Sequence, residues 1–320
     1  MIKLRGDLVS KREERIGEEN INNQGLRMWI CDYRKYNDID IQFEDGYISK
    51  GKEYKVFKRG GINNPNYPFS QIIDRTGEEN VNIYGSKMKI IKYKNANNID
   101  VQFEDGYICY NTHYQYFKKG SIVSPYDKTV LNIGCLGEGK YNYTENHKNT
   151  NQYKTWFSML QRCYDNKFQE KHPSYKGCGV CEEWLNFQNF AEWYEKNYYK
   201  VDNEQMCLDK DILNKNNKIY SPNTCIFVPQ SINKLFTKRQ NDRGKYPIGV
   251  TCKINNKFSS NCNINGKRKF LGYFDNENYA FEAYKKFKED YIKEKAEEYK
   301  EKIPKRLYEA MYDYIVEIDD

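Results

Sequence analysis

The chain reads LDKDILNKNNKIYSPNTCIFVPQSIN at residues 208–233. Two short apolar runs separated by a polar loop predict two strands, and Pro229 is a favoured first residue for a helix after the second. This order would place the carboxylate of Asp209 on a strand and the amide of Asn233 on a helix. Such oxygen ligands suit a hard divalent cation held over a phosphate.

The surrounding segment, residues 153–236, is predicted to be mixed in secondary structure. Apolar residues at helical spacing predict helices over residues 156–164 and 184–198. Strands are predicted at residues 206–211 and 225–228, on either side of the polar loop.

An internal repeat fills the first 125 residues. GEEN at residues 17–20 recurs at 77–80, and QFEDGYI at residues 42–48 recurs at 102–108. The offset is a constant 60, and about half of the paired positions are identical. Alternating apolar and polar residues, with Gly and Asn at the turns, predict two copies of one small β module of about five short strands.

Both copies are rich in aromatic and basic residues, and two interpretations stay open. The modules could follow successive stretches of duplex DNA, or Tyr and Lys could simply cover a solvated β surface. The residues concerned are Arg27, Tyr33, Arg34, Lys35 and Tyr54 in the first copy, and Lys87, Lys89, Tyr93, Lys94 and Tyr116 in the second.

After residue 245 the pattern predicts three strands and a helix. The strands are residues 248–252, 257–264 and 268–274, with hairpin turns at 255–256 and 265–266. A helix follows with one apolar face, formed by Ala280, Phe281, Tyr284 and Phe287. A charged continuation ends at Pro304, and a short tail helix is predicted beyond it.

Charge is distributed unevenly along the chain. The formal net charge is +7, and some of it reflects a composition rich in Lys, Asn, Ile and Tyr, as AT-rich codons produce. Residues 238–274 hold nine Lys or Arg and one acid, so this segment alone carries 9 − 1 = +8. A local field of that size favours a polyanionic partner.

Other features predict a soluble, intracellular protein of several domains. At 320 residues the chain is long for one core, and its mean hydropathy is −0.98. No apolar run approaches the roughly 18 residues of a membrane span, and no signal peptide is evident. The ten cysteines are therefore expected to be reduced. Clustered thiols would then point to metal, and scattered ones to small buried apolar residues.

Four fragments together resemble the phage-type subgroup of HNH (ββα-metal) endonucleases. They are WFSMLQRCY at residues 156–164, VCEEW at 180–184, LDK at 208–210 and YSPNTC at 220–225. The resemblance covers about a quarter of the chain and is specific as a multipart match. It implies a ββα core in which Asp209 and Asn233 bind one Mg²⁺ or Mn²⁺ ion.

The chain departs from that family at two positions. A histidine that activates water usually follows the Asp, and Lys210 stands there. An ammonium of ordinary pKa cannot accept a proton, so Lys210 is predicted to clamp the phosphate. Tyr220 is the candidate general base, with His172 as the alternative. Thr224 replaces the middle Asn of the motif and would lose its amide fork.

Cysteines lie beside all three predicted core elements. Cys163, Cys181 and Cys225 are candidate ligands of a structural zinc ion, and the fourth ligand stays open. The candidates for it are His172, Cys178 and Cys207. The alternative is that all are small buried thiols.

The C-terminal part resembles an AP2-type DNA-binding domain. The resemblance rests on YPIGV at residues 246–250, LGYFD at 271–275 and AFEAY at 280–284. It implies a three-stranded sheet lying in the major groove, with few strand arginines for base readout. By position the contact candidates are Lys253, Lys257, Ser259, Asn261, Arg268 and Lys269.

The sequence thus predicts an α+β multidomain protein. The expected domains are β-rich repeats at 15–70 and 75–130, an HNH-like nuclease domain at 134–238, an AP2-like domain at 244–302 and a C-terminal helix at 303–320. The expected function is metal-dependent cleavage of double-stranded DNA, resembling homing endonucleases, in the cytoplasm of a phage-infected or prophage-carrying bacterial cell. One site per chain suits nicking, and a double-strand break would need a homodimer. The rival interpretations are a non-catalytic DNA-binding or anti-defence protein on a decayed nuclease scaffold, and an RNA-directed nuclease.

Overall fold

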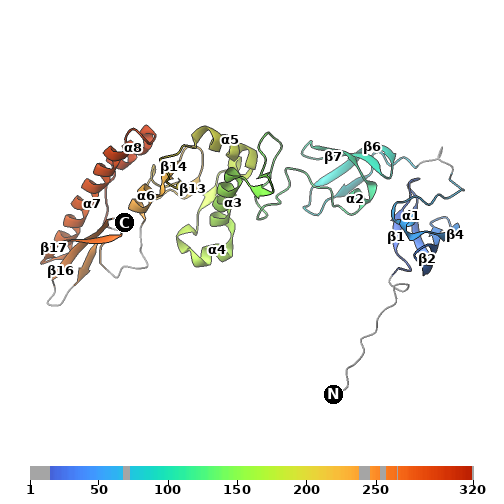
Figure 1. The fold of residues 1–320 in the computed structure, drawn as a ribbon, viewed down its shortest axis with the longest axis horizontal. Helices are drawn as coiled ribbons and strands as arrows, with labels where there is room; N and C mark the ends of the chain where they lie inside the picture. Colours follow the sequence, from blue (N-terminus) through green and yellow to red (C-terminus); the bar gives the residue numbers. More distant parts are fainter. Residues whose placement is uncertain (1–14, 68–72, 238–245, 253–256, 265, 319–320) are drawn as a thin grey trace, which may run out of the picture. The chain divides into compact units, whose positions relative to one another are not determined.

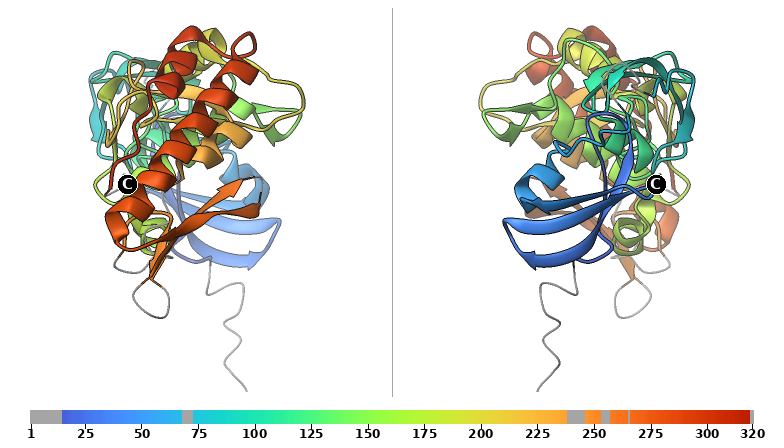
Figure 2. Two further views of the ribbon diagram at one scale, coloured as in Figure 1. Left: turned by 90° about the vertical axis from the view of Figure 1, so that its left-hand side faces the viewer. Right: turned by 90° about the vertical axis from the view of Figure 1, so that its right-hand side faces the viewer.

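A computed structural model describes residues 15–67, 73–237, 246–252, 257–264 and 266–318. The chain is α+β, built from several small sheets and helices, as the sequence predicted (Figures 1 and 2). By their internal contacts the residues fall into two compact units. These units are residues 1–129 with 135–138, and residues 130–134 with 139–320.

The first unit contains two copies of one fold, each a four-stranded antiparallel sheet followed by a helical turn. The first copy consists of β1 (Glu19–Ile21), β2 (Arg27–Lys35), β3 (Asp38–Phe43), β4 (Ile48–Lys52) and α1 (Tyr54–Lys58). The second consists of β5 (Glu79–Val81), β6 (Lys87–Asn95), β7 (Asn98–Phe103), β8 (Ile108–Thr112) and α2 (Tyr114–Lys118). Every boundary in the second copy lies 60 residues after its counterpart.

Alternation along β2 and β3 builds the core of each copy. Met28 faces Phe43 and Ile30 faces Ile41 across the two strands, and all four side chains are buried. The prediction of about five strands was wrong, because the fifth element is helical. Its Phe57 turns inward and is fully buried.

The second unit begins with short elements and two longer helices. Its elements up to residue 236 are β9 (Thr144–Glu145), β10 (Lys148–Asn149), α3 (Asn151–Tyr164), α4 (Asn166–Lys171), η2 (Pro173–Tyr175), β11 (Gly179–Val180), η3 (Glu182–Leu185), α5 (Phe187–Asn197), β12 (Met206–Asp209), β13 (Ile219–Tyr220), β14 (Ile226–Pro229), α6 (Gln230–Asn233) and η4 (Lys234–Phe236). The predicted helix over residues 184–198 is divided in two. Asn186 caps a new helix there, because its side chain accepts from the backbone N–H of Gln188 at 2.9 Å.

The strand pair at the centre of this segment is antiparallel. In β12 and β14, Met206 faces Pro229 and Asp209 faces Ile226. Helix α6 follows β14 directly and contacts both strands. The order strand, loop, strand, helix was therefore predicted correctly, although β12 ends at Asp209 rather than at residue 211.

The remaining elements form a three-stranded antiparallel sheet and two helices. They are β15 (Val250–Cys252), β16 (Phe258–Ile264), β17 (Lys267–Phe274), α7 (Glu277–Tyr299) and α8 (Lys305–Tyr312). Figure 2 shows α7 lying across the strands. Gly249 allows this approach, because its φ is +78° and a Cβ there would lie 2.1 Å from the Tyr284 ring. The predicted turn at residues 255–256 lies outside the described residues.

Helix α7 takes part in two separate apolar cores. Near its beginning, Ala280, Phe281 and Tyr284 pack with sheet residues such as Val250 and Cys262. Near its end, Ile292 and Ala296 are fully buried in the second core. That second core also holds Val201, Ile212, Ile226, Val228 and Ile232 from the segment around β12 and β14, and Leu307 and Met311 from α8. The segment that resembles a nuclease core and the sheet are thus parts of one packed unit.

Among the described residues, no helix combines the length and the apolar character that a membrane crossing requires.

Candidate functional site around Asp209

The two carboxylate oxygens of Asp209 have different surroundings. Oδ1 accepts hydrogen bonds from the backbone N–H groups of Asp211 at 2.9 Å and Ile212 at 2.8 Å, and so fixes the turn after β12. Oδ2 accepts none from any residue that the structure describes. Burial raises the pKa of the Asp209 carboxyl above its usual range, and the nearby Asp211 adds to this, while the two N–H groups oppose it. A cation near Oδ2 would favour the ionised form.

Cys207 connects Asp209 to Asn233. It lies two residues before Asp209, so both side chains project from the same face of β12. Burial raises the pKa of the Cys207 thiol, whereas the Arg162 guanidinium and a hydrogen bond with the Asn233 side chain lower it. Asp209, Asn233 and Arg162 are thus all near enough to influence the Cys207 thiol, and α6 contacts β12. Among the described residues no hydrogen bond joins Asp209 to Asn233, so their joint role as metal ligands stays a prediction.

Arg162 is a member of this cluster to which the sequence analysis gave no role. It comes from the last turn of α3, and its Nη1 donates to the hydroxyl of Tyr220 at 3.4 Å. Its guanidinium also lies 5.6 Å from the centre of the Tyr175 ring. It forms no ion pair with a carboxylate in the described part of the chain. One sequence signal could have indicated this role: an arginine in the last turn of a helix whose inner face is apolar.

Lys210, which was predicted to bind the phosphate, is buried and already bonded within the protein. The residue follows the end of β12 and is 6% exposed. Its Nζ donates to Asp211 Oδ2 at 2.8 Å and to the carbonyl of Asn217 at 3.0 Å, and it lies 5.7 Å from the centre of the Tyr220 ring. The ammonium is thus already engaged in holding the loop that follows β12.

Tyr220 is fully enclosed, with an exposure of 2%. Burial raises the pKa of its phenol well above the usual range, and the neighbouring Arg162 opposes this only in part. A general base needs a pKa nearer to neutral. The environment therefore works against the role that the sequence suggested for Tyr220.

A side-chain amide does stabilise the loop between β12 and β14, but it belongs to Asn217. Asn217 Nδ2 donates to the carbonyls of Lys210 at 2.8 Å and Ile219 at 2.7 Å, so one amide joins both sides of the loop. The Thr224 hydroxyl donates to the same Ile219 carbonyl at 2.9 Å. The expected loss of the amide fork at Thr224 is compensated from another position, which sequence spacing alone could not indicate.

His172 and the cysteines are spread over several places. His172 is exposed and packs on Phe168, with ring centres 4.5 Å apart, and no described contact links it to Asp209. Burial raises the pKa of the Cys163 and Cys225 thiols to about 12, and the pKa of Cys181 is raised for the same reason. These raised pKa values favour neutral SH groups, and a bound zinc ion would favour the thiolates that it binds.

The grouping of these thiols also matters for metal binding. Cys178 lies close enough to Cys163 to raise the pKa of the Cys163 thiol, and Cys181 does the same for Cys225. In the described residues, no three His, Cys, Asp or Glu side chains form a group that could hold a metal ion. The structural zinc site therefore stays a prediction.

The candidate DNA contacts on the C-terminal sheet fall into different environments. Arg268 is exposed, and Phe270 and Tyr273 on the same strand are 53% and 65% exposed. Asn261 is partly buried and donates to the hydroxyl of Ser259 at 3.3 Å. Ser259 itself is buried, at 1% exposure, which leaves little of it for a partner.

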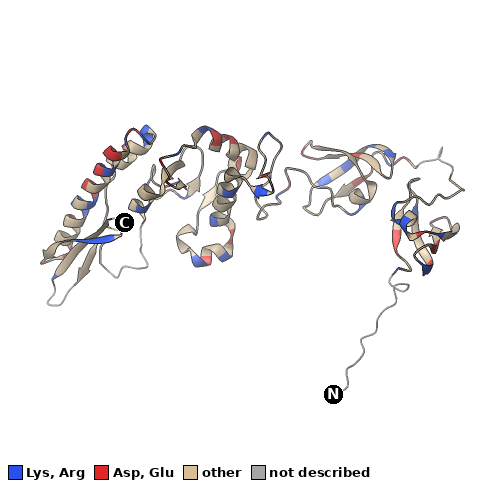
Figure 3. Ribbon diagram, in the orientation of Figure 1, with Lys and Arg blue, Asp and Glu red and all other residues tan. Residues whose placement is uncertain are grey.

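Two lysines of this sheet already interact with other residues of the protein. Lys257 pairs with Asp275. Lys269 lies on the helix side of the sheet, where its Nζ is 4.5 Å from the centre of the Phe287 ring on α7. Lys253 lies outside the described residues. Figure 3 shows the basic residues of β17 in blue.

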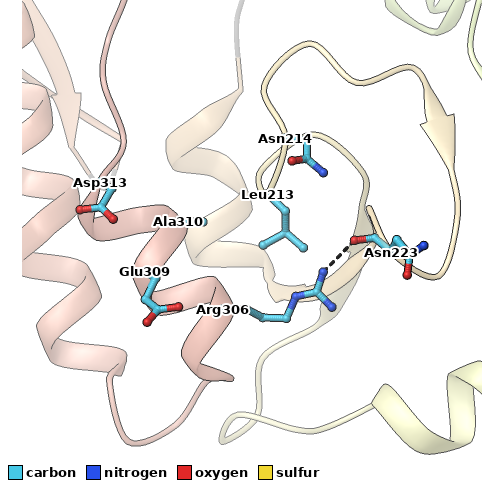
Figure 4. A pocket seen from close by; sticks show the side chains of 7 residues that line it. All are labelled: Leu213, Asn214, Asn223, Arg306, Glu309, Ala310 and Asp313. Carbon is cyan, nitrogen blue, oxygen red and sulfur yellow. Dashed lines mark hydrogen bonds between the residues drawn. The ribbon is translucent and has the colours of Figure 1, made fainter.

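A pocket of about 360 Å³ lies beside the loop after β12 (Figure 4). In it, Arg306 of α8 donates to the carbonyl of Asn223 at 2.8 Å and so ties the loop to the helix. The lining carries charges of both signs, with Glu309 and Asp313 beside Arg306. The pocket therefore lies at the interface where α8 packs against the loop.

Comparison with known proteins assigns no family. No protein-family model matches the chain, and no curated protein and no solved structure matches it significantly.

Proposed function

We propose that the protein is a metal-dependent DNA endonuclease of the HNH type. The observation that carries the proposal is the cluster of Asp209, Asn233 and Arg162 around Cys207, at the junction of a strand pair and a helix. It combines one free carboxylate oxygen, one amide and one guanidinium without a carboxylate partner among the described residues. That set suits a phosphodiester and a divalent cation.

The cluster fits a hard cation by its ligand types. The free Oδ2 of Asp209 and the amide oxygen of Asn233 would hold it, with water and phosphate oxygens completing its shell, as Mg²⁺ prefers. When bound, the ion would neutralise the scissile phosphate and stabilise the leaving oxygen. The raised pKa of Asp209 agrees with a site that gains from a bound cation.

The side chains around the cluster have separate roles in this proposal. Arg162 binds a phosphate oxygen through a charge-assisted hydrogen bond, because in the described part of the chain its guanidinium contacts only tyrosines. Lys210 and Asn217 hold the loop that shapes the site. Tyr220 positions Arg162 and takes no part in proton transfer.

The C-terminal sheet is proposed to deliver DNA to this site. Arg268 supplies a positive charge, and Phe270 and Tyr273 supply exposed aromatic surface on the same strand. Because α7 packs against both the sheet and the core of β12 and β14, the sheet and the site keep a fixed relation.

The proposal is tested by incubating the purified chain with supercoiled phage or plasmid DNA and Mg²⁺ or Mn²⁺. Nicked circles that disappear with EDTA are expected. An RNA substrate in the same assay tests the RNA-directed alternative. DNA that stays intact with both metals, although the protein binds it, would contradict the proposal.

A second candidate is a non-catalytic DNA-binding protein on a nuclease scaffold. It is favoured by one observation: Lys210 and Tyr220, which replace the usual histidine chemistry, are both buried and engaged. Binding of DNA without strand cleavage in the assay above would support this second function.

A further inference from the structure

The two N-terminal copies provide an internal comparison, because they share a fold and about half of their residues. Their buried positions agree: Met28 and Ile30 of the first copy correspond to Met88 and Ile90 of the second. The corresponding strands β2 and β6 differ at most exposed positions. Differences concentrated on one surface indicate that the copies contact different partners.

In the first copy, two of the three cations of β2 are paired with carboxylates in place. Arg27 pairs with Glu19 at 2.8 Å. Arg34 binds three carboxylates, those of Asp32 and Asp38 at 2.7 Å and that of Asp40 at 2.6 Å. On this strand, only Lys35 forms no ion pair with a residue that the structure describes, so it offers less free positive charge to a polyanion than the strand of the second copy.

In the second copy the same strand is a row of available lysines. Asp32 is replaced by Lys92 and Asp38 by Asn98, so these two positions, which hold carboxylate partners of Arg34 in the first copy, are together more positive by 2 + 1 = 3 charges around Lys94. Lys87, Lys92 and Lys94 are exposed and form no ion pair with a residue that the structure describes. Lys89 pairs with Glu79 at 3.2 Å, and both side chains are more than half exposed. Figure 3 shows the basic residues of this strand in blue.

The turn before this strand also differs between the copies: it is engaged within the protein in the first copy and exposed in the second. In the first copy, Asn23 accepts from Asn97 of the second copy at 2.6 Å, and Gln24 is buried at 2% exposure. The corresponding residues of the second copy are Ile83 and Tyr84, which are 68% and 46% exposed. The first turn is thus occupied in holding the copies together, while the second presents apolar surface to solvent.

We infer that the outer face of the second copy is a separate DNA-binding surface, and that the first copy is not. This β6 face consists of Ile83, Tyr84, Lys87, Lys89, Lys92 and Lys94. Its lysines contact phosphates of one duplex segment, and Ile83 and Tyr84 pack against the groove beside it. A row of exposed lysines, three of them without an ion pair to a described residue, next to an exposed aromatic turn fits DNA better than an acidic peptide, which offers fewer regularly spaced charges. The choice of DNA as the polyanion rests on the proposed function.

The test uses the full chain with Asp209→Asn, which should not cut, and measures its affinity for duplex DNA by fluorescence anisotropy over a range of salt. The first variant gives the second copy the residues of the first, Lys92→Asp and Asn98→Asp. This pattern is already tolerated by the fold of the first copy. We expect a loss of affinity of about tenfold or more, and a salt slope smaller by about two to three.

A matched control removes the same charge from the first copy. Lys35→Asn, Lys50→Tyr and Lys52→Thr introduce the residues of the second copy and also change the charge by −3. Affinity is expected to stay within about twofold of the parent. Equal losses in the two variants would show an effect of net charge alone and would overturn the inference, as would no loss in either.

A second variant, Ile83→Asn with Tyr84→Gln, tests the turn. Affinity should fall while the salt slope stays the same, because apolar contacts release no counterions. Vesicles of phosphatidylglycerol and phosphatidylcholine form the other arm. If the Lys92→Asp, Asn98→Asp variant lost vesicle binding and kept its DNA affinity, the surface would be a membrane site and the inference would be wrong.

Failure of the proposed function would be distinguishable in these experiments. A wild-type chain that binds DNA through the β6 face but never cuts it contradicts only the nuclease. A chain that cuts DNA with undiminished affinity after Lys92→Asp and Asn98→Asp contradicts only the β6 face.

Discussion

At the scale of single residues, Asp209 offers the most direct test of the site. Asp209→Asn keeps an oxygen that can accept from Asp211 and Ile212, but replaces the free Oδ2 by an amide nitrogen. We expect DNA cleavage to fall by about 10³-fold, because loss of a metal ligand removes several kcal/mol of transition-state stabilisation. Nicking of supercoiled DNA measures this. Asn233→Ala should have a similar effect.

Asp211→Asn is the control for this prediction. It removes the ion pair with Lys210 and leaves the Asp209 carboxylate in place. Cleavage should change much less than in Asp209→Asn. Full activity of Asp209→Asn, with the fold confirmed by circular dichroism, would show that the ion is held elsewhere.

Tyr220→Phe separates a positioning role from a proton-transfer role. The change removes the hydroxyl that accepts from Arg162 at 3.4 Å and leaves the ring in its buried place. We expect cleavage to stay within about tenfold, whereas loss of a general base would cost at least about 10²-fold. His172→Ala should leave the rate unchanged, because that ring is exposed and, among the described residues, packs on Phe168 rather than near Asp209. Single-turnover cleavage rates of the two variants decide between the roles.

Asp40 gives a prediction for the pH dependence of stability. The hydrogen bond from Arg34 holds the pKa of Asp40 below its usual range, with the N–H of Gly51 adding to the effect against burial. The folded state therefore binds fewer protons than the unfolded state in this window. The stabilisation is present above the unfolded pKa of about 3.9 and is lost as pH falls through the lower folded pKa.

Asp40→Asn should accordingly destabilise the first copy by about 1–2 kcal/mol near pH 6 and by much less near pH 3. Hydrogen exchange of the β2 and β3 amides in both proteins at each pH measures the difference. Asp100→Asn in the second copy is the control, because Asp100 accepts the equivalent backbone bond, from Asn111 at 2.9 Å, without an arginine partner. An effect of Asp40→Asn that does not depend on pH would contradict this explanation.

At the scale of elements, local patterns predicted the strands and helices better than their packing. The turn, strand and helix signals around Asp209 and Pro229 located β12, β14 and α6 to within about two residues. The role of Arg162 depends on bringing α3 against β12, and nothing in either segment indicates that contact. Asn217 likewise braces a loop whose shape exists only after folding.

Helix α7 shows the same limit and leads to a test. The apolar spacing at Phe281 and Tyr284 predicted its first half, but Ile292 lies in a highly charged stretch and is nevertheless fully buried. Ile292→Ala should cost about 2–5 kcal/mol, because it leaves a cavity in the core shared with β12 and β14. Hydrogen exchange in residues 206–209 should therefore accelerate.

Glu294→Ala is the control, since Glu294 is exposed on the same helix. It should leave exchange in β12 unchanged. If Ile292→Ala loosened only α7 and left β12 fully protected, the two cores would be independent, and the fixed relation between sheet and site would have to be abandoned.

At the scale of the whole molecule, the repeat with its constant offset of 60 was the strongest sequence signal, and it located every element of the second copy from the first. The boundary between the two units was harder to predict from the sequence. The predicted nuclease domain began at residue 134, but the structure assigns residues 130–134 to the second unit and 135–138 to the first. Gly134 belongs there because a Cβ on it would lie 2.7 Å from Leu160 and 2.9 Å from Trp156 of α3.

This boundary predicts which C-terminal fragment will fold stably and nick DNA. A fragment of residues 130–320 keeps Val130 and Gly134, which bond to each other at 3.0 Å beside α3, and should fold and nick DNA. It should bind DNA more weakly and with a smaller salt slope than the full chain, because it lacks the β6 lysines. A fragment of residues 139–320 loses the segment packed on Trp156 and Leu160, so its thermal midpoint should be lower. Thermal unfolding and nicking of the two fragments test this, and equal stability would place residues 130–134 outside the core. Failure of residues 130–320 to fold would instead show that the second unit depends on the first.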